Sequence, residues 1–273
     1  MVLIEQKIPI EKLITYEVTG PSPHYMFFSG IHGDEGSICG LLDSALNHRP
    51  DSFPSSLKLL RANRPALKLN KRGVGDNKII DANRYFNDGE KGDWIAREIK
   101  EVMVKHPEIE YVFSFHEETD KNGYQDKEGG GIETFERDPD SFYMYDAFNA
   151  DESSVDEILP FYNSLISSLT ENGFTLYTGY DDYTTDRNET VQLNPVVNGY
   201  CPQPSNRDNF IDGSFENWVI DQGIKRSFLF EIPHGLSIER KKEMIQIIFK
   251  KFIIPFLNQV YDLNFPDSKT FSF

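Results

Sequence analysis

The stretch "FFSGIHGDEGSICG", residues 27–40, decides the fold class, because a strand turns into a helix within it. The apolar run over 24–30 predicts a buried strand, and apolar residues return at helical spacing over 35–48. His32 and Glu35 lie in the turn between these two elements. Because α/β sheets collect their ligands at the carboxyl ends of strands, this turn is a candidate functional site.

The same alternation of strands and helices continues along the chain. Further strands are predicted at 56–63, 108–117, 174–180 and 225–233, and further helices at 93–106, 155–173, 214–223 and 237–260. The apolar runs of the strands are continuous, which is typical of strands buried on both faces. The pattern favours a single α/β domain over 1–273, with a mixed, mostly parallel sheet covered by helices on both faces. Long polar loops, usually functional in compact domains, are predicted at 64–92, 117–152 and 181–213.

Composition and charge exclude several classes of partner. The 273 residues carry a formal net charge of −16, and 38% of them are hydrophobic. The hydrophobic fraction supports a folded core, whereas the negative charge disfavours nucleic acid and anionic membranes as partners. No apolar stretch approaches the ~18 residues that a membrane span needs. The N-terminus lacks the basic start and long apolar block of a secretory signal, so a cytoplasmic location is expected.

Polar residues with metal-binding or acid–base chemistry recur at predicted strand ends. His32 and Glu35 follow one strand, His116 ends another, and Glu231 lies within the apolar strand "FLFEIP". A hydrolytic zinc site needs three protein ligands, an open position and a nearby base. The H-x-x-E spacing alone is a weak signal, and a strand-end histidine is often structural. A carboxylate in an apolar strand is costly to bury without a partner, so Glu231 is the stronger indication of function.

The segment "DANRYF", residues 81–86, offers a site for an anion. An arginine held as Arg84 is here can clamp a carboxylate with two parallel hydrogen bonds. The alternative is a structural arginine that pairs with Asp81 or Asp88. Taken alone, the segment does not distinguish the two.

Three motifs in this order resemble the zinc carboxypeptidase superfamily. They are "SGIHGDEGSICG" (29–40), "DANRYF" (81–86) and "GSFENWVIDQGIKRSFLFEIP" (213–233), and the last is especially similar to carboxypeptidase A-like enzymes. The superfamily also holds the succinylglutamate desuccinylase and aspartoacylase branch. The resemblance runs from about residue 25 to the end of the sequence and is looser over 118–212. It implies a sheet of about eight strands and a zinc-dependent hydrolase.

Carried over to this sequence, the resemblance implies a role for each matching residue. His32, Glu35 and His116 would hold one Zn²⁺ ion. Glu231 would be the general base, which takes a proton from the attacking water and hands it to the leaving amine.

The resemblance also implies the residues that contact the substrate. Asn83 and Arg84 would bind a carboxylate of the substrate. Arg72 would stabilise the oxyanion that develops at the scissile carbonyl. Arg72 is the least constrained of these assignments, because other basic residues are close in sequence, namely Arg61, Arg64 and Lys71.

The expected activity is amide hydrolysis, with release of a C-terminal residue from a peptide. One alternative is a deacylase acting on an N-acyl amino acid, as in the aspartoacylase branch. The other is a binding protein that keeps the fold without catalysis. In each enzymatic case the expected partner is a peptide or acyl-amino-acid substrate with a free carboxylate.

The sequence departs from the carboxypeptidase A pattern in two places. The segment "SNRDNFIDGS", residues 205–214, lacks the substrate-loop tyrosine of that family, and Tyr200 or another tyrosine could replace it. The second departure follows His116, where the family often has a small or hydroxyl residue and this sequence has Glu117, Glu118 and Asp120. These residues begin a stretch over 117–157 with 14 acidic and three basic residues. This acidic run is either a solvated surface or a selector for substrates with an amine or guanidinium, through Glu117, Glu118 or Asp120.

Overall fold

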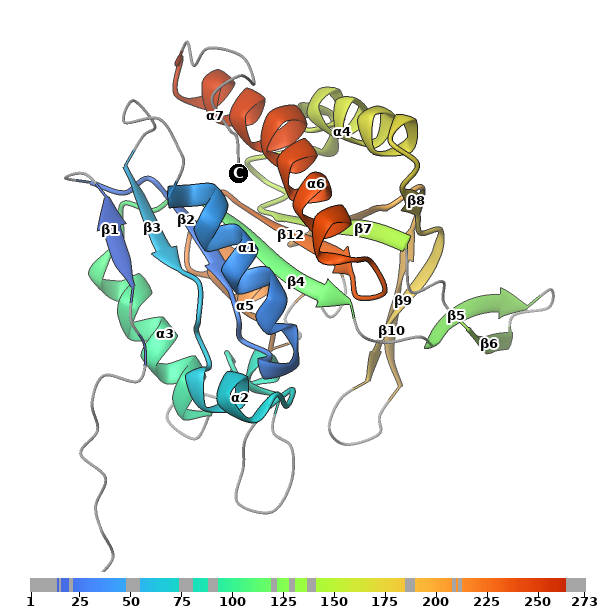
Figure 1. The fold of residues 1–273 in the computed structure, drawn as a ribbon, viewed down its shortest axis with the longest axis horizontal. Coiled ribbons are helices and arrows are strands. Elements are labelled where there is room, and N and C mark those ends of the chain that lie inside the picture. Colours follow the sequence, from blue (N-terminus) through green and yellow to red (C-terminus); the bar gives the residue numbers. More distant parts are fainter. Residues whose placement is uncertain are drawn as a thin grey trace, which may run out of the picture.

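A computed structural model gives the fold of the chain (Figure 1). It describes residues 14, 16–19, 22–47, 55–73, 81–87, 93–118, 122–127, 131–136, 141–184, 190–207, 210 and 213–263.

An eight-stranded mixed sheet forms the centre of the molecule. Its strands, in spatial order, are β1 (Glu17–Thr19), β3 (Ser56–Leu59), β2 (Tyr25–Ser29), β4 (Tyr111–Glu118), β12 (Arg226–Pro233), β7 (Ser141–Phe148) and β11 (Tyr200–Pro204), and β8 (Thr175–Leu176) pairs with β7. The β1–β3 and β12–β7 pairs are antiparallel, and the other pairs are parallel. The predicted mixed, mostly parallel sheet is therefore confirmed.

Helices cover both faces of this sheet (Figure 1). One face packs against α1 (Gly36–Asn47), α4 (Leu159–Glu171), α6 (Ile238–Ile248), a π-helical segment (Phe249–Ile253) and α7 (Ile254–Val260); the other packs against α3 (Trp94–Lys105) and α5 (Phe215–Asp221). Side-chain alternation along β2 explains the two cores, because Tyr25 and Phe27 join the first and Met26 and Phe28 the second. Within the described residues, every helix is too short or too polar to cross a bilayer.

The prediction of a loop over 64–92 is wrong at its start, where the short helix α2 (Arg64–Leu69) forms. The Asn63 side chain caps this helix by accepting a hydrogen bond from Ala66 N, and Pro65 occupies its first turn. Both residues suit a helix start, but a helix of six residues leaves little apolar periodicity to detect. A 3-10 turn (Ala82–Arg84) follows within the same interval.

The loops predicted over 117–152 and 181–213 are also wrong in part, because more than half of the first interval and about half of the second pair into sheets. β7 and β11 belong to the central sheet, whereas β10 (Thr190–Val196), β9 (Gly179–Thr184), β5 (Asn122–Lys127) and β6 (Gly131–Glu136) form a second, four-stranded sheet. Polar and charged residues dominate the sequences of β5, β6 and β9. Strand formation there depends on cross-strand pairing, which apolar periodicity does not reveal.

Candidate metal centre

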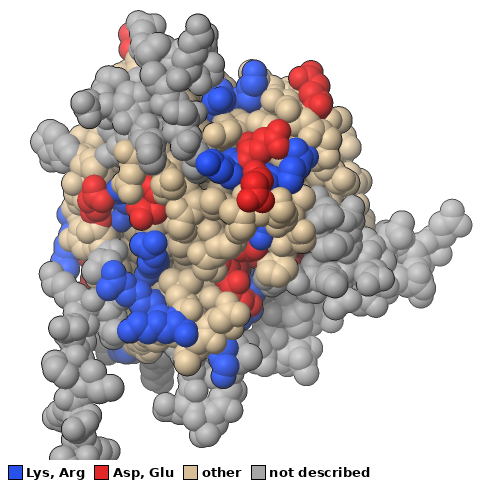
Figure 2. Space-filling model, in the orientation of Figure 1, with Lys and Arg blue, Asp and Glu red and all other residues tan. Residues whose placement is uncertain are grey.

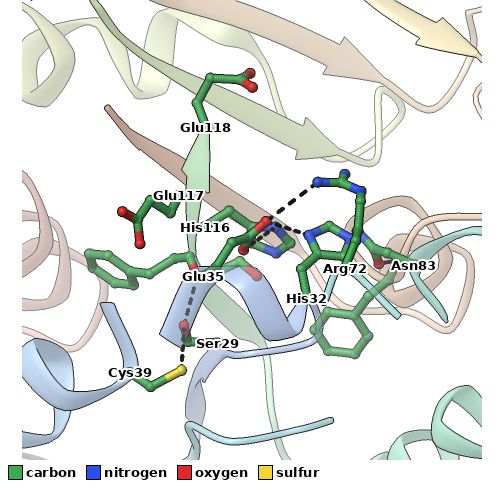
Figure 3. A network of polar contacts seen from close by, with 12 residues as sticks. Ser29, His32, Glu35, Cys39, Arg72, Asn83, His116, Glu117 and Glu118 are labelled. Atoms are coloured by element: carbon green, nitrogen blue, oxygen red, sulfur yellow. Dashed lines mark hydrogen bonds and ion pairs between the residues drawn. The ribbon is translucent and has the colours of Figure 1, made fainter. Parts of the chain in front are cut away.

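Three buried side chains converge at one edge of the central sheet, although His32 and His116 are far apart in sequence (Figure 3). His32 follows β2, Glu35 ends a 3-10 turn (Gly33–Glu35), and His116 lies near the end of β4. One potential ligand atom from each residue lies within 4.8 Å of the others. His32 Nδ1 is 2.5 Å from Glu35 Oε1, and His116 Nδ1 is 3.4 Å from Glu35 Oε2.

The pairing of β2 with β4 brings these residues together. The two strands are parallel neighbours, with Ser29 in register with Phe115. The Ser29 hydroxyl also donates a 2.8 Å hydrogen bond to the Phe115 carbonyl. Because both strands end at the same edge of the sheet, the residues that follow Ser29 and Phe115 meet there.

A close backbone contact at Gly33 fixes the turn that carries Glu35. A Cβ atom at this position would lie 2.0 Å from the carbonyl carbon of Ala66 in α2, a distance that real Cβ atoms do not reach. Gly33 N also lies within hydrogen-bonding distance of Arg72 O, at 3.4 Å. Only glycine lets α2 pack this closely against the turn.

The donor set fits one divalent metal ion. Two imidazole nitrogens and one carboxylate suit zinc, which in hydrolytic sites keeps a further position open. Glu35 Oε2 is buried and has no hydrogen-bond partner among the residues that the structure describes. A carboxylate oxygen left in this state is costly, and a cation between the three side chains would satisfy it.

Opposing charges set the protonation of the cluster. Burial raises the pKa of Glu35, but His32 and His116 outweigh it and lower that pKa below its usual range. Burial and Arg72 lower the pKa of His32, whereas Glu35 and Asp81 raise it, with a result of about 9. The cluster therefore favours positive charge beside the Glu35 carboxylate, as a metal-binding site must.

The carboxylate of Asp81 orients the His32 ring from the side away from Glu35. His32 Nε2 donates to Asp81 Oδ1 at 2.9 Å, which directs Nδ1 toward Glu35. Asp81 is also held by Arg72, whose Nε lies 3.2 Å from Asp81 Oδ2. Burial opposes ionisation of Asp81, but His32 and the neighbouring arginines hold its pKa well below the usual range. Such outer carboxylates fix the orientation of a metal-ligating histidine and raise its basicity.

The residues predicted to contact the substrate differ in their exposure and in their hydrogen bonds. Arg72 is partly exposed, and its Nη1 is 3.7 Å from Glu35 Oε1. The buried amide of Asn83 donates to Glu216 Oε2 at 3.3 Å and accepts from Phe215 N at 2.9 Å. Arg84 Nη1 donates to the Asn83 carbonyl at 2.9 Å. Asn83 thus has internal partners for both ends of its amide, whereas Arg72 reaches the surface.

The register of β12 places Glu231 next to His116. Glu231 pairs with His116 of β4 on one side and with Tyr143 of β7 on the other. Residues in register on neighbouring strands point to the same face of a sheet. The partly buried Glu231 carboxylate therefore shares a face with the His116 imidazole.

The acidic residues after His116 point in different directions. Glu117 is buried and accepts hydrogen bonds from Ser37 Oγ at 2.7 Å and from the Lys241 ammonium. This pairing makes Glu117 a structural anion, on the opposite face from His116. Glu118 shares the face of His116 and accepts a 2.5 Å hydrogen bond from the Tyr143 hydroxyl. Asp120 lies outside the described residues.

Tyr200 is buried away from the cluster. Its hydroxyl donates a 2.6 Å hydrogen bond to Asp146 Oδ2, and it pairs in register with Met144 in the core beneath α4. Tyr143, next to Met144, points to the opposite face, where Glu231 lies. The geometry therefore disfavours Tyr200 as the substitute for the missing substrate-loop tyrosine.

Sequence reasoning missed one functional candidate, Glu216. It lies on α5, is 3% exposed, and contacts Ser114 Oγ at 2.6 Å and His116 Nε2 at 3.5 Å. Burial raises its pKa, but the contacts with His116 and Ser114 outweigh burial and lower that pKa to about 2. The available signal was a carboxylate within the otherwise largely apolar helix "FENWVID".

Solved structures share this fold. A protein provisionally named a metallopeptidase, from Shewanella denitrificans, superposes with a TM-score of 0.60 at 17% identity, covering 89% of this chain and 79% of that one. The tripeptide-bound cell shape determinant Csd4 of Helicobacter pylori gives a TM-score of 0.57 at 18% identity over 93% of this chain and 57% of that one.

The mDAP-bound form of Csd4, described as a D,L-carboxypeptidase, gives a TM-score of 0.53 at 20% identity, covering 88% of this chain and 51% of that one. At these identities the likeness establishes the fold. No protein-family model and no curated protein matches the sequence.

Proposed function

We propose that this chain is a zinc-dependent metallopeptidase of the carboxypeptidase type, which releases the C-terminal residue of a peptide. The observation that carries the proposal is the buried cluster of His32, Glu35 and His116, with Glu231 in register beside His116. The fold shared with Csd4, a D,L-carboxypeptidase by its description, supports the same reading. A cytoplasmic location stays a prediction.

In the proposed mechanism, His32, Glu35 and His116 hold the ion, and Asp81 keeps the His32 ring in place. A bound divalent ion supplies a Lewis acid that polarises the scissile carbonyl and favours ionisation of water. Glu231 takes the proton of the attacking water and passes it to the leaving amine. Its place next to His116 keeps this carboxylate close to the reacting centre without making it a ligand.

In this proposal, basic residues around α2 and the Asn83–Arg84 turn favour a substrate with an anionic end. The segment 61–72 holds five basic residues and no acidic one. Figure 2 shows Lys and Arg side chains gathered around α2, although the chain as a whole carries a formal net charge of −16. We assign the oxyanion contact to the partly exposed Arg72, and the contact with the terminal carboxylate to the Asn83–Arg84 turn.

The test combines metal analysis with a substrate panel on one purified sample. The panel holds peptides with free C-termini, the same peptides with amidated C-termini, and N-acyl amino acids. We expect one zinc ion per chain, and cleavage of free peptides that a chelator abolishes and zinc restores. Turnover confined to N-acyl amino acids would replace the proposal with the deacylase, and bound zinc without any turnover would indicate a binding protein.

Arg84→Ala separates recognition of the carboxylate from structural support. We expect a higher KM for peptides with a free C-terminal carboxylate and little change for any residual cleavage of amidated ones. An equal loss on both kinds of peptide would mean that Arg84 acts structurally, through its hydrogen bond to the Asn83 carbonyl.

A further inference from the structure

The carboxylate of Glu216 lies directly behind the His116 ring, on the side away from Glu35. We propose that Glu216 is a positioning residue, which accepts the Nε2–H proton of His116 and thereby presents Nδ1 to the metal. The inference rests on the metal site proposed above, and it assigns a role to a residue outside the three ligands and the base.

The two nitrogens of His116 face two different carboxylates. Nδ1 lies 3.4 Å from Glu35 Oε2, inside the cluster, and Nε2 lies 3.5 Å from Glu216 Oε1, outside it. Nε2 is buried and makes no hydrogen bond among the described residues, and the Glu216 carboxylate is the acceptor that lies within reach. A buried ring nitrogen without a hydrogen bond is costly, and Glu216 can satisfy it by accepting its proton.

Glu216 cannot easily turn away from His116, because its neighbours hold both carboxylate oxygens. Ser114 Oγ donates to Oε1 at 2.6 Å, and Asn83 Nδ2 donates to Oε2 at 3.3 Å. Ser114 precedes His116 by two positions on β4, so both side chains point to the face that α5 covers. A buried carboxylate fixed in this way is a rigid acceptor.

The other histidine of the cluster shows the same arrangement in a tighter form. His32 Nε2 donates to Asp81 Oδ1 at 2.9 Å while its Nδ1 faces Glu35. With Glu216 in the corresponding place, each imidazole has a carboxylate behind it and Glu35 in front. This arrangement favours a proton on Nε2 of both rings and directs the Nδ1 lone pair of each ring toward the metal position.

Glu216 also links the metal centre to the predicted substrate-binding turn. Asn83 donates to Glu216 and accepts from Phe215 N, so the 3-10 turn and the start of α5 are joined at this carboxylate. If Asn83 moved when a substrate bound, the movement would be passed to His116 through the Glu216 side chain.

Two measurements test the proposal without relying on turnover. The first is NMR of wild-type protein with nitrogen-labelled histidine and bound NMR-active cadmium. We expect the cadmium–nitrogen coupling of His116 at Nδ1, and a hydrogen-bonded proton at Nε2. Coupling at Nε2 would overturn the proposal, and this measurement needs no variant to fold.

The second measurement compares zinc affinity in Glu216→Gln and in a matched control, Asp146→Asn. Asp146 is also a buried carboxylate of the central sheet, but it points to the face opposite that of Glu231. Its replacement therefore shows the effect of losing a buried carboxylate away from the metal centre. We expect Glu216→Gln to weaken zinc binding about 10- to 100-fold, the usual cost of losing an outer-shell partner, and Asp146→Asn to leave it unchanged. Equal affinities in wild type and Glu216→Gln would overturn the proposal.

The outcomes separate this inference from the proposed function. If the wild-type protein binds no zinc or cadmium, the metal centre itself fails, and the role of Glu216 fails with it. If the wild-type protein binds zinc and cleaves peptides while Glu216→Gln retains full affinity, the proposed function stands and only the role of Glu216 is wrong.

Discussion

Glu231 and His116 are neighbours in register, yet the proposed mechanism gives them different tasks. Because the proposed mechanism does not make Glu231 a ligand, Glu231→Gln should keep its zinc while losing the group that moves the proton. We expect turnover to fall by at least ~10²-fold, the usual scale for losing a general base. The assay is kcat on a peptide verified as substrate, with zinc content measured on the same sample. Normal turnover would remove Glu231 from the mechanism.

The buried carboxylate of Asp146, which lies outside the site, should make the stability of the fold depend on pH. Burial outweighs the nearby Arg226 and Tyr200 and raises the pKa of Asp146 to about 6 in the folded chain, from about 3.9 when unfolded. The folded state therefore holds this proton more tightly. The contribution of protonated Asp146 to the unfolding free energy is therefore fully present below about pH 4, and it is lost as the pH rises through about 6.

Asp146→Asn should remove this component of the pH dependence. Between pH 4 and 7, the wild type should lose up to about 3 kcal/mol of unfolding free energy relative to the variant, since one pKa unit corresponds to about 1.36 kcal/mol. Denaturant unfolding of both proteins across this range measures the difference. A constant difference at every pH would show that Asp146 ionises equally in the folded and unfolded chains.

At the scale of elements, the packing of α2 against the Gly33–Glu35 turn holds one proposed ligand, Glu35, in place. Gly33→Ala would put a Cβ atom 2.0 Å from the Ala66 carbonyl carbon, so α2 must move and Glu35 with it. We expect lower thermal stability and weaker zinc binding, measured by thermal unfolding and competitive metal titration.

Gly40→Ala, within α1, is the matched control. A Cβ atom there meets no heavy atom within 4 Å, and alanine favours a helix over glycine by up to about 1 kcal/mol. The control should therefore be as stable as the wild type or more so, with unchanged zinc affinity. If both variants behave alike, the close contact at Gly33 does not position Glu35.

Elements with continuous apolar patterns could be predicted from the sequence, and those that depend on partners could not. The helix predicted over 35–48 is α1 (Gly36–Asn47), and the strand predicted over 225–233 is β12 (Arg226–Pro233). The helix predicted over 237–260 is continuous but contains a π-helical segment just before Pro255, whose ring nitrogen cannot donate a backbone hydrogen bond. α2 was missed because capping defines it, whereas β7 was missed although its sequence, SFYMYDAF, is largely apolar.

The candidate site follows the same division. His32, Glu35 and His116 could be named as candidates because each lies at a predicted strand end, where parallel strands deliver side chains to one edge, but their role as metal ligands came from the resemblance to zinc carboxypeptidases. The structure brings the three together, and their metal-binding role stays a prediction. Glu216 was missed although a carboxylate in a largely apolar helix was a signal, because its partners Ser114 and His116 reach it only when α5 packs on β4.

At the scale of the whole molecule, the candidate metal centre joins segments from most of the chain. His32 follows β2, His116 belongs to β4, Asp81 precedes the 3-10 turn, and Glu216 belongs to α5. No short segment contains the complete set, so the unfolded chain should bind a metal ion poorly. Zinc should therefore stabilise the fold as a whole, because a ligand that binds only the folded state shifts the unfolding equilibrium.

The expected size of this shift follows from the affinity. At a free zinc concentration about 100 times the Kd, the unfolding free energy should rise by about 2.7 kcal/mol. Thermal unfolding with zinc and after chelation measures the effect as a rise in Tm. His116→Ala should lose the zinc-dependent shift, whereas Glu231→Gln should retain it, since only the first variant removes a ligand. If zinc still raised the Tm of His116→Ala, the stabilising ion would bind elsewhere in the molecule. The cluster would then no longer support the proposed activity.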